Sequence, residues 1–144
     1  RAALAQSKDW AKMQRAMSSV TTAVSESVFR TTGITGGSAD NITSKNPVHS
    51  YISMNVRDPG KYVEAWQKLQ SSRSGDNGAS TIIQVMEAGD MGITHVVSLS
   101  ANSMADLMSG NQNDAAWREF LASVRDIRDV VDDAIVVDLM AWGA

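Results

Sequence analysis

The order of two hydrophobic periods along residues 48–144 constrains the fold more than any other feature of this sequence. Residues 48–56 alternate apolar and polar side chains, as a half-buried β-strand does. Asp58 and Pro59 follow at once, and these residue types are typical of a helix cap and of the first helical position. Beyond them, apolar residues recur every three or four positions up to Leu69. The sequence therefore predicts a strand followed directly by an amphipathic helix.

The rest of this stretch predicts three more strands and two more helices. Ser103 and Asp106 have the spacing of a capping box, which marks the start of a short helix. The predicted segments are strands over 80–88 and 93–100, helices over 104–109 and 114–131, and a last strand over 134–141. With the short helix set aside, the order is β-α-β-β-α-β. This is the ferredoxin-like arrangement, an α+β fold in which an antiparallel sheet carries its helices on one face.

The uncovered face of that sheet needs a partner. Three predicted strands carry apolar residues on both sides, as Ile82 and Ile83 do. Left in water, such a face would form an apolar patch of several hundred Å². We therefore expect two sheets to pair face to face into an α+β barrel. The second sheet would come from another copy of the chain or from an internal repeat.

A weak internal repeat favours the second source. Shifting the sequence by 107 residues places Trp10 on Trp117, and other apolar residues of a predicted helix over 7–25 fall on apolar positions of the helix over 114–131. Each helix is followed by a predicted strand, the first of them over 27–34. We interpret the chain as residues 1–34, the C-terminal helix and strand of a preceding ferredoxin-like unit that begins upstream of Arg1; residues 35–47, a connecting loop; and residues 48–144, a complete unit.

Composition excludes several classes of function. The formal net charge is −3, which argues against strong electrostatic binding to the phosphates of nucleic acids. No apolar run reaches the roughly 18 residues that span a membrane. The chain has no cysteine, so thiolate metal sites and disulfides are excluded, and a cytoplasmic location is expected. We expect no cofactor, no metal, and neither a nucleic acid nor a membrane as partner.

The residues from Val48 to Trp142 resemble the dimeric α+β barrel superfamily, in its antibiotic-biosynthesis-monooxygenase-like group. The resemblance rests on element order and on three segments: Asp58-Pro59-Gly60, the strand from Ile93 that runs into Ser103, and the helix at Trp117. It implies two sheets packed face to face, by homodimerisation or by tandem repeats. Its members include cofactor-free oxygenases, haem-degrading enzymes and isomerases. No pattern of one active site is matched, so the resemblance assigns no catalytic residue.

A polar row on the first strand of this region is the main candidate site. Alternation places His49, Tyr51, Ser53 and Asn55 on one face. A histidine can move protons near neutral pH, and the other side chains can orient a polar group. The alternative is a satisfied polar rim or a contact with the partner sheet.

Three further polar residues sit in predicted strands among apolar neighbours. Gln84, His95 and Asp138 are candidates to line the same cavity, although a hydrogen-bonded core histidine or a paired aspartate explains them equally well. The aspartates over 126–133 alternate with arginines on the predicted polar side of a helix, and we interpret them as a solvated face. The predicted ligand-binding residues are His49, Tyr51, Asn55, Gln84, His95 and Asp138, with His49 and Asp138 as catalytic candidates.

These observations favour a protein of the dimeric α+β barrel type that binds a small apolar ligand. One alternative is a cofactor-independent monooxygenase or isomerase that acts on a small oxygenated metabolite at the same site. The other is a purely structural assembly domain with a filled barrel. In each case, a homo-oligomer or an intramolecular repeat is the expected partner.

Overall fold

A computed structural model of the chain describes residues 7–22, 27–72, 79–89, 92–109 and 115–139. The strands are β1 (Val28–Gly36), β2 (Val48–Val56), β3 (Ala79–Ala88), β4 (His95–Ala101) and β5 (Arg128–Val137). The helices are α2 (Lys8–Ser18), the 3-10 helix η1 (Ala39–Asn41), α3 (Pro59–Ser72), α4 (Met104–Ser109) and α5 (Ala115–Val124).

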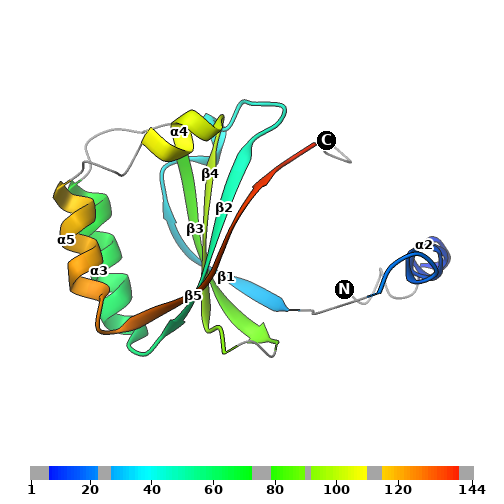
Figure 1. The fold of residues 1–144 in the computed structure, drawn as a ribbon, viewed down its shortest axis with the longest axis horizontal. Coiled ribbons are helices and arrows are strands. Elements are labelled where there is room, and N and C mark those ends of the chain that lie inside the picture. The colour runs from blue at the N-terminus through cyan, green and yellow to red at the C-terminus, as the bar shows by residue number, and fades with distance from the viewer. Residues whose placement is uncertain (1–6, 23–26, 73–78, 90–91, 110–114, 140–144) are drawn as a thin grey trace.

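The strands form one antiparallel sheet in the order β1-β3-β4-β2-β5. Helices α3 and α5 lie side by side on one face of it, while α2 stands apart on the other side (Figure 1). The fold is α+β and is compatible with a ferredoxin-like arrangement. The sheet has a fifth strand beyond the four predicted ones, because β1 pairs with β3 at the edge. That residues 1–34 end a preceding unit stays a prediction.

The core lies between α3, α5 and the sheet. Tyr62, Trp66 and Leu69 of α3 are buried there, together with Phe120 of α5. The Phe120 ring meets Tyr62 and Trp66 edge to face, with centroids 5.8 and 5.7 Å apart. The strands contribute Met54, Val56, Ile83 and Val97 to this core. The apolar residues that recur at helical spacing in α3 and α5 are therefore buried, as the sequence predicts. Their burial decides which face of the sheet the two helices cover.

Local capping explains where two helices begin. The Asp58 carboxylate accepts a hydrogen bond from the Lys61 backbone N–H at 3.1 Å, and this bond lowers the pKa of Asp58. At the start of α4, Ser103 Oγ accepts from the Asp106 N–H at 3.1 Å and donates to its carboxylate at 2.7 Å. Both predicted starts are confirmed, since each depends on residues three positions apart.

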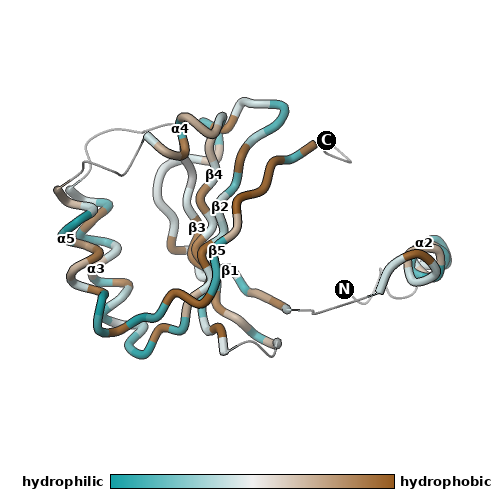
Figure 2. The backbone as a smooth tube through the Cα atoms, in the orientation of Figure 1, coloured by the Kyte–Doolittle hydropathy of each residue, from teal (hydrophilic) through white to brown (hydrophobic). Residues whose placement is uncertain are grey.

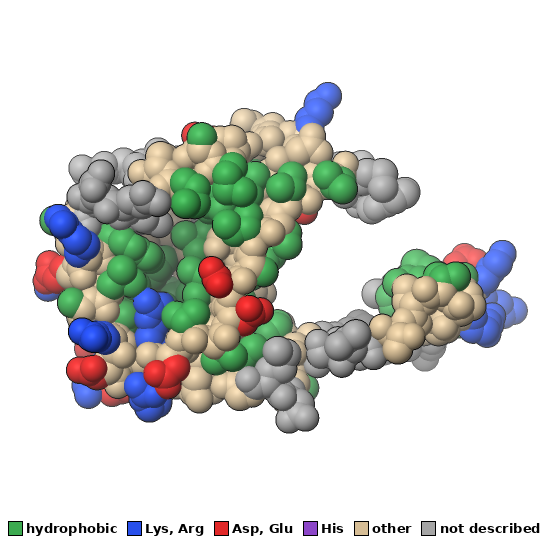
Figure 3. Space-filling model, viewed as in Figure 1, with side chains coloured by type: hydrophobic (Ala, Val, Ile, Leu, Met, Phe, Trp, Pro, Cys, Tyr) green, Lys and Arg blue, Asp and Glu red, His purple; other side chains and the backbone are tan. Residues whose placement is uncertain are grey.

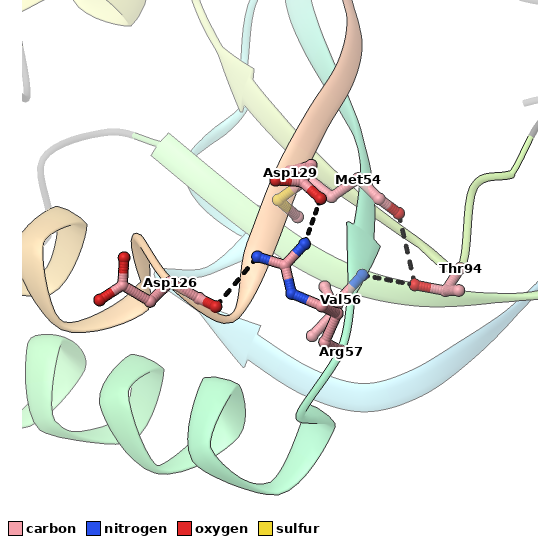
Figure 4. A network of polar contacts seen from close by, with 6 residues as sticks. All are labelled: Met54, Val56, Arg57, Thr94, Asp126 and Asp129. Atoms are coloured by element: carbon pink, nitrogen blue, oxygen red, sulfur yellow. Dashed lines mark hydrogen bonds and ion pairs between the residues drawn. The ribbon is translucent and has the colours of Figure 1, made fainter.

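The end of the second long helix was predicted wrongly. The apolar spacing up to Val131 predicted a helix over 114–131, but α5 ends at Val124 and β5 begins at Arg128. The Arg57 N–H donates to Ile127 O at 2.8 Å, and its guanidinium donates to Asp126 O at 2.9 Å and pairs with Asp129 (Figure 4). These contacts hold the turn between α5 and β5 against the end of β2.

As a result, the aspartates after this turn lie on a strand. Asp129, Asp132 and Asp133 are exposed residues of β5 rather than one side of a helix. The adjacent Val130 and Val131 are β-branched, which favours a strand over a helix. Beside the turn, Thr94 Oγ1 accepts from the Val56 N–H at 2.8 Å (Figure 4), which ties the start of β4 to the end of β2.

The face away from α3 and α5, called the open face below, is mixed in character. Register places Ile82, Met86, Val96 and Val136 on it, between polar residues of β2, β3 and β4. It is therefore not the continuous apolar surface that the sequence suggested, and the pairing of two sheets into a barrel stays a prediction. Figure 2 shows hydrophobic residues continuing along β5 toward its C-terminal end. Among the described helices, none is long and apolar enough to cross a membrane.

Candidate functional site

His49 is the centre of a hydrogen-bonded group on the open face. Its Nδ1 lies 2.8 Å from Ser100 Oγ, and its Nε2 lies 3.2 Å from Asp138 Oδ2. The His49 side chain is 17% exposed, whereas that of Asp138 is 49% exposed. The group therefore combines a mostly covered imidazole with a carboxylate that water and ligands can reach.

Strand pairing explains why these residues meet. In the sheet, β2 lies between β4 and β5, and His49 is directly opposite Ser100 on one side and Val136 on the other. Asp138 follows Val136 by two positions and so lies on the same face. Its backbone is held in place, because the Asp138 N–H donates to Pro47 O at 3.1 Å and its carbonyl accepts from the Asn46 side chain at 2.8 Å.

The geometry assigns hydrogen-bonding roles to the two nitrogens of the ring. The Asp138 carboxylate is only an acceptor, so the Nε2–H of His49 donates a hydrogen bond to it. Nδ1 then accepts a hydrogen bond from the Ser100 hydroxyl. Such an arrangement lets His49 receive a proton at Nδ1 through Ser100, while Asp138 stabilises the resulting imidazolium. The three side chains can also bind a hydroxyl or carbonyl group without any transfer.

Tyr51 and Gln84 extend this polar group across the sheet. Tyr51 stacks beside His49, with ring centroids 6.2 Å apart and planes at 29°. Ser98 lies opposite Tyr51 on β4, and its Oγ donates to Gln84 Oε1 of β3 at 3.2 Å. The predicted residues His49, Tyr51, Gln84 and Asp138 therefore share one face and form a continuous polar strip with the two serines.

Asn55 and His95 lie elsewhere. Asn55 is on the open face, but it is six positions from His49, or about 20 Å along the strand, and it pairs in register with Asp129. His95 is on the opposite, helix-facing side, in register with Met54 and Val85. The structure thus does not bring either residue to the polar strip.

The environment of His95 is that of a buried histidine. The residue is 8% exposed, and its Nδ1 lies 2.8 Å from Thr94 Oγ1. Burial lowers the pKa of His95, because the charged imidazolium loses its hydration. It lines an open cavity of about 390 Å³ at the ends of β3 and β4, with Met86 and Glu87 among its neighbours.

A further groove of about 310 Å³ runs between α3 and α5. Leu69 and Phe120 form its floor, and Lys61, Glu64, Lys68 and Glu119 are among its charged lining residues. Lys68 and Glu119 face each other across it, with Nζ and Oε1 2.6 Å apart. Among the described residues, no group of His, Asp and Glu side chains could hold a metal ion.

Sequence reasoning missed the two serines of β4. Both lie in a strand that was predicted, and alternation already placed Ser98 and Ser100 on one face of it. What the sequence lacks is the register, which pairs Ser100 with His49 and Ser98 with Tyr51. A register shift of one residue between β2 and β4 would have placed both serines on the face of the sheet opposite to His49 and Tyr51.

No family model, curated protein or solved structure was found to match this chain.

Proposed function

We propose that this chain is a small-molecule-binding protein of the dimeric α+β barrel type, and that its ligand lies against the polar strip of the open face. The observation that carries the proposal is the position of His49 between Ser100 and Asp138, with Tyr51 stacked beside it. These groups offer donors and acceptors to a hydroxyl or carbonyl group. Neighbouring Val136 and Ile82 offer apolar contact to a ring or alkyl chain.

The proposal includes a partner for the open face. A face of this mixed kind, paired with a second copy, would enclose the polar strip between two sheets about 10 Å apart. Such an enclosure excludes water and strengthens hydrogen bonds to a ligand. The barrel is therefore part of the proposed binding site, and the ligand class is a small, mainly apolar molecule with one or two oxygen atoms.

An NMR titration tests this function. The probes are 1-naphthol, 2-tetralone and benzoate, added one at a time to the ¹⁵N-labelled chain. We expect the amide signals of His49, Tyr51 and Ser98 to move with at least one probe, and those of Lys61 and Glu64 on α3 to stay in place. His49→Ala and Tyr51→Leu are expected to weaken that binding at least about tenfold, a loss of ~1.4 kcal/mol.

Two other results of this titration would contradict the proposed ligand site. If the probes shift only residues of the groove between α3 and α5, the ligand site is there and the proposal is wrong. If no probe shifts the amide signal of any open-face residue in the fully associated protein, the alternative of a structural assembly domain with a filled barrel is favoured.

One observation supports a second candidate function, a cofactor-independent enzyme that transfers protons. The path from Ser100 through His49 to Asp138 suits an isomerase, in which a proton beside a carbonyl passes to Ser100 Oγ as the hydroxyl proton of Ser100 passes to His49 Nδ1. The enolate then regains a proton from Ser100 Oγ at another carbon atom, and His49 Nδ1 returns its proton to Ser100. Hydrogen–deuterium exchange at the carbon next to the 2-tetralone carbonyl, followed by NMR in D₂O, measures this step. Exchange no faster with the protein than with His49→Ala would rule it out for this probe.

A further inference from the structure

Arg128, the first residue of β5, directs its side chain toward the core between the sheet and the two long helices. It lies opposite Val56 of β2, on the face that α3 and α5 cover. Its Nη1 donates a hydrogen bond to Met54 Sδ at 3.1 Å, and its Cζ is 5.9 Å from the centre of the Phe120 ring. Met54 and Phe120 are buried, whereas Arg128 is only partly buried and so stays within reach of water. The guanidinium therefore lies at the edge of the core, between α5 and β2.

The charge of Arg128 has no carboxylate partner among the residues that the structure describes. Four more exposed cations do have one, since ion pairs join Arg30 to Glu87, Arg57 to Asp129, Lys61 to Asp58 and Lys68 to Glu119. The charge of Arg128 instead acts on the Tyr62 hydroxyl, where it opposes the rise in pKa that the burial of Tyr62 causes. The more covered cation is thus the one whose charge is not neutralised.

The contacts of Arg128 leave much of its binding capacity unused. Arginine side chains are seldom buried unless they are paired. A guanidinium carries five N–H donors, and a thioether sulfur is a weak acceptor for them. An aromatic ring attracts the charge as well, but a carboxylate also accepts two parallel hydrogen bonds. An anion is therefore the partner that this position fits best.

The surroundings of Arg128 indicate what kind of molecule carries that anion. Val130 follows Arg128 by two positions on the same face of β5, lies opposite Met54, and is 54% exposed. On the same face, Ile52 of β2 is partly buried, and the partly buried Trp117 of α5 stacks on Phe120 with ring centroids 5.3 Å apart. Figure 3 shows a hollow between the helix pair and the sheet, with hydrophobic side chains on its walls and a Lys or Arg side chain between them.

We propose that Arg128 binds the carboxylate of a small organic acid whose apolar body lies against Val130 and Ile52. One guanidinium balances one negative charge, so the ligand class is a monocarboxylate. Apolar walls disfavour a second charged group, because burying such a group without a partner is costly. This site is on the face of the sheet opposite to the polar strip. It is therefore separate from the ligand site proposed above and does not depend on it.

An NMR titration of the ¹⁵N-labelled chain with octanoate and with 3-phenylpropanoate tests this site. Octanamide and 3-phenylpropanamide are the neutral twins of these acids. We expect the amide signals of Val130 and Ile52 to move with at least one acid, and its amide to bind at least about tenfold more weakly at these signals. Inorganic phosphate, which has no apolar body, is expected to leave both signals in place.

Two matched substitutions assign the binding to Arg128. Arg128→Gln is expected to weaken the binding of the acid at least about tenfold, whereas Arg118→Gln, which removes the same charge from an exposed position of α5, is expected to leave it unchanged. Arg128→Lys keeps the charge without the fork of donors and is expected to bind more tightly than Arg128→Gln. This third variant decides the matter if Arg128→Gln does not fold.

The results that would overturn the proposal are distinct from those that test the polar strip. An acid that moves only the signals of His49 and Tyr51 binds at the polar strip, so this inference would be wrong while the proposed function stands. Equal binding of an acid and its amide, equal binding by wild type and the Arg128 variants, or no shift of Val130 and Ile52 with either acid would each refute a carboxylate site at Arg128.

Discussion

His49 Nδ1 lies 2.8 Å from Ser100 Oγ, and the two residues occupy directly opposed positions on β2 and β4. The remaining ring nitrogen faces Asp138 at 3.2 Å. A histidine held from both sides within a sheet has a defined ring orientation before any ligand arrives. Such preorganisation is what a binding or proton-transfer site requires.

The first prediction separates a functional His49 from a structural one. Because Asp138 is half-exposed and Ser100 is only partly buried, water can replace the contacts that His49 makes, and His49→Ala is expected to lower the free energy of unfolding by only about 1 kcal/mol. Urea unfolding followed by circular dichroism measures this change, and Ser100→Ala is the companion variant. A loss of about 3 kcal/mol or more would mark the group as a structural element of the sheet.

The second prediction concerns the aromatic core. Phe120 is buried between the rings of Tyr62 and Trp66, so Phe120→Ala leaves a cavity that the two helices cannot close. We expect a loss of about 3–5 kcal/mol in the free energy of unfolding. Val131→Ala is the matched control, since Val131 is exposed and its truncation should change stability by no more than about 0.5 kcal/mol. Equal effects of the two substitutions would contradict the core described for α3 and α5.

The third prediction is a pH dependence that originates in His95. Burial lowers the pKa of His95 in the folded chain, while the unfolded chain retains the ordinary value of about 6.5. Below that value the unfolded state binds the proton more readily, so stability must fall as the pH decreases from about 6.5 through the lower pKa of the folded state. Above it, both states are neutral and His95 contributes no pH dependence.

Comparison with His95→Gln isolates this contribution from that of the carboxylates. The free energy of unfolding of both proteins is measured on either side of pH ~6.5, and the wild-type chain is expected to lose more stability on acidification. Parallel pH profiles for the two proteins would show that His95 has the same proton affinity folded and unfolded.

The fourth prediction contrasts two glycines. Gly33 has a φ of +79° at the register shift between Thr31 and Thr35 of β1, so an alanine there must adopt a left-handed backbone. Gly33→Ala is expected to cost about 1 kcal/mol of unfolding free energy. Gly60→Ala, in the first turn of α3 with an ordinary backbone, is expected to gain a few tenths of a kcal/mol, roughly 0.4. Thermal unfolding decides between them, and a stabilising Gly33→Ala would contradict the bulge in β1.

The sequence alone determined the parts of this chain that depend on near neighbours. The strand over 48–56, the cap at Asp58 and the capping box at Ser103 each need only residues a few positions apart, and all three were predicted from their spacing. The placement of His49 and Tyr51 on one face also follows from strand alternation, so the first half of the candidate site was predictable.

The tertiary structure decided everything that depends on pairing between distant segments. The apolar pattern from Trp117 to Val131 fits a helix throughout, but its last part pairs with β2 as a strand, and the contacts of Arg57 with Asp126 and Asp129 hold the turn before it. In the same way, the register of β2 with β4 and β5 selects Ser100 and Asp138 as the partners of His49. A local sequence sets the period of its side chains, but hydrogen bonds between strands far apart in the chain set which side chains meet.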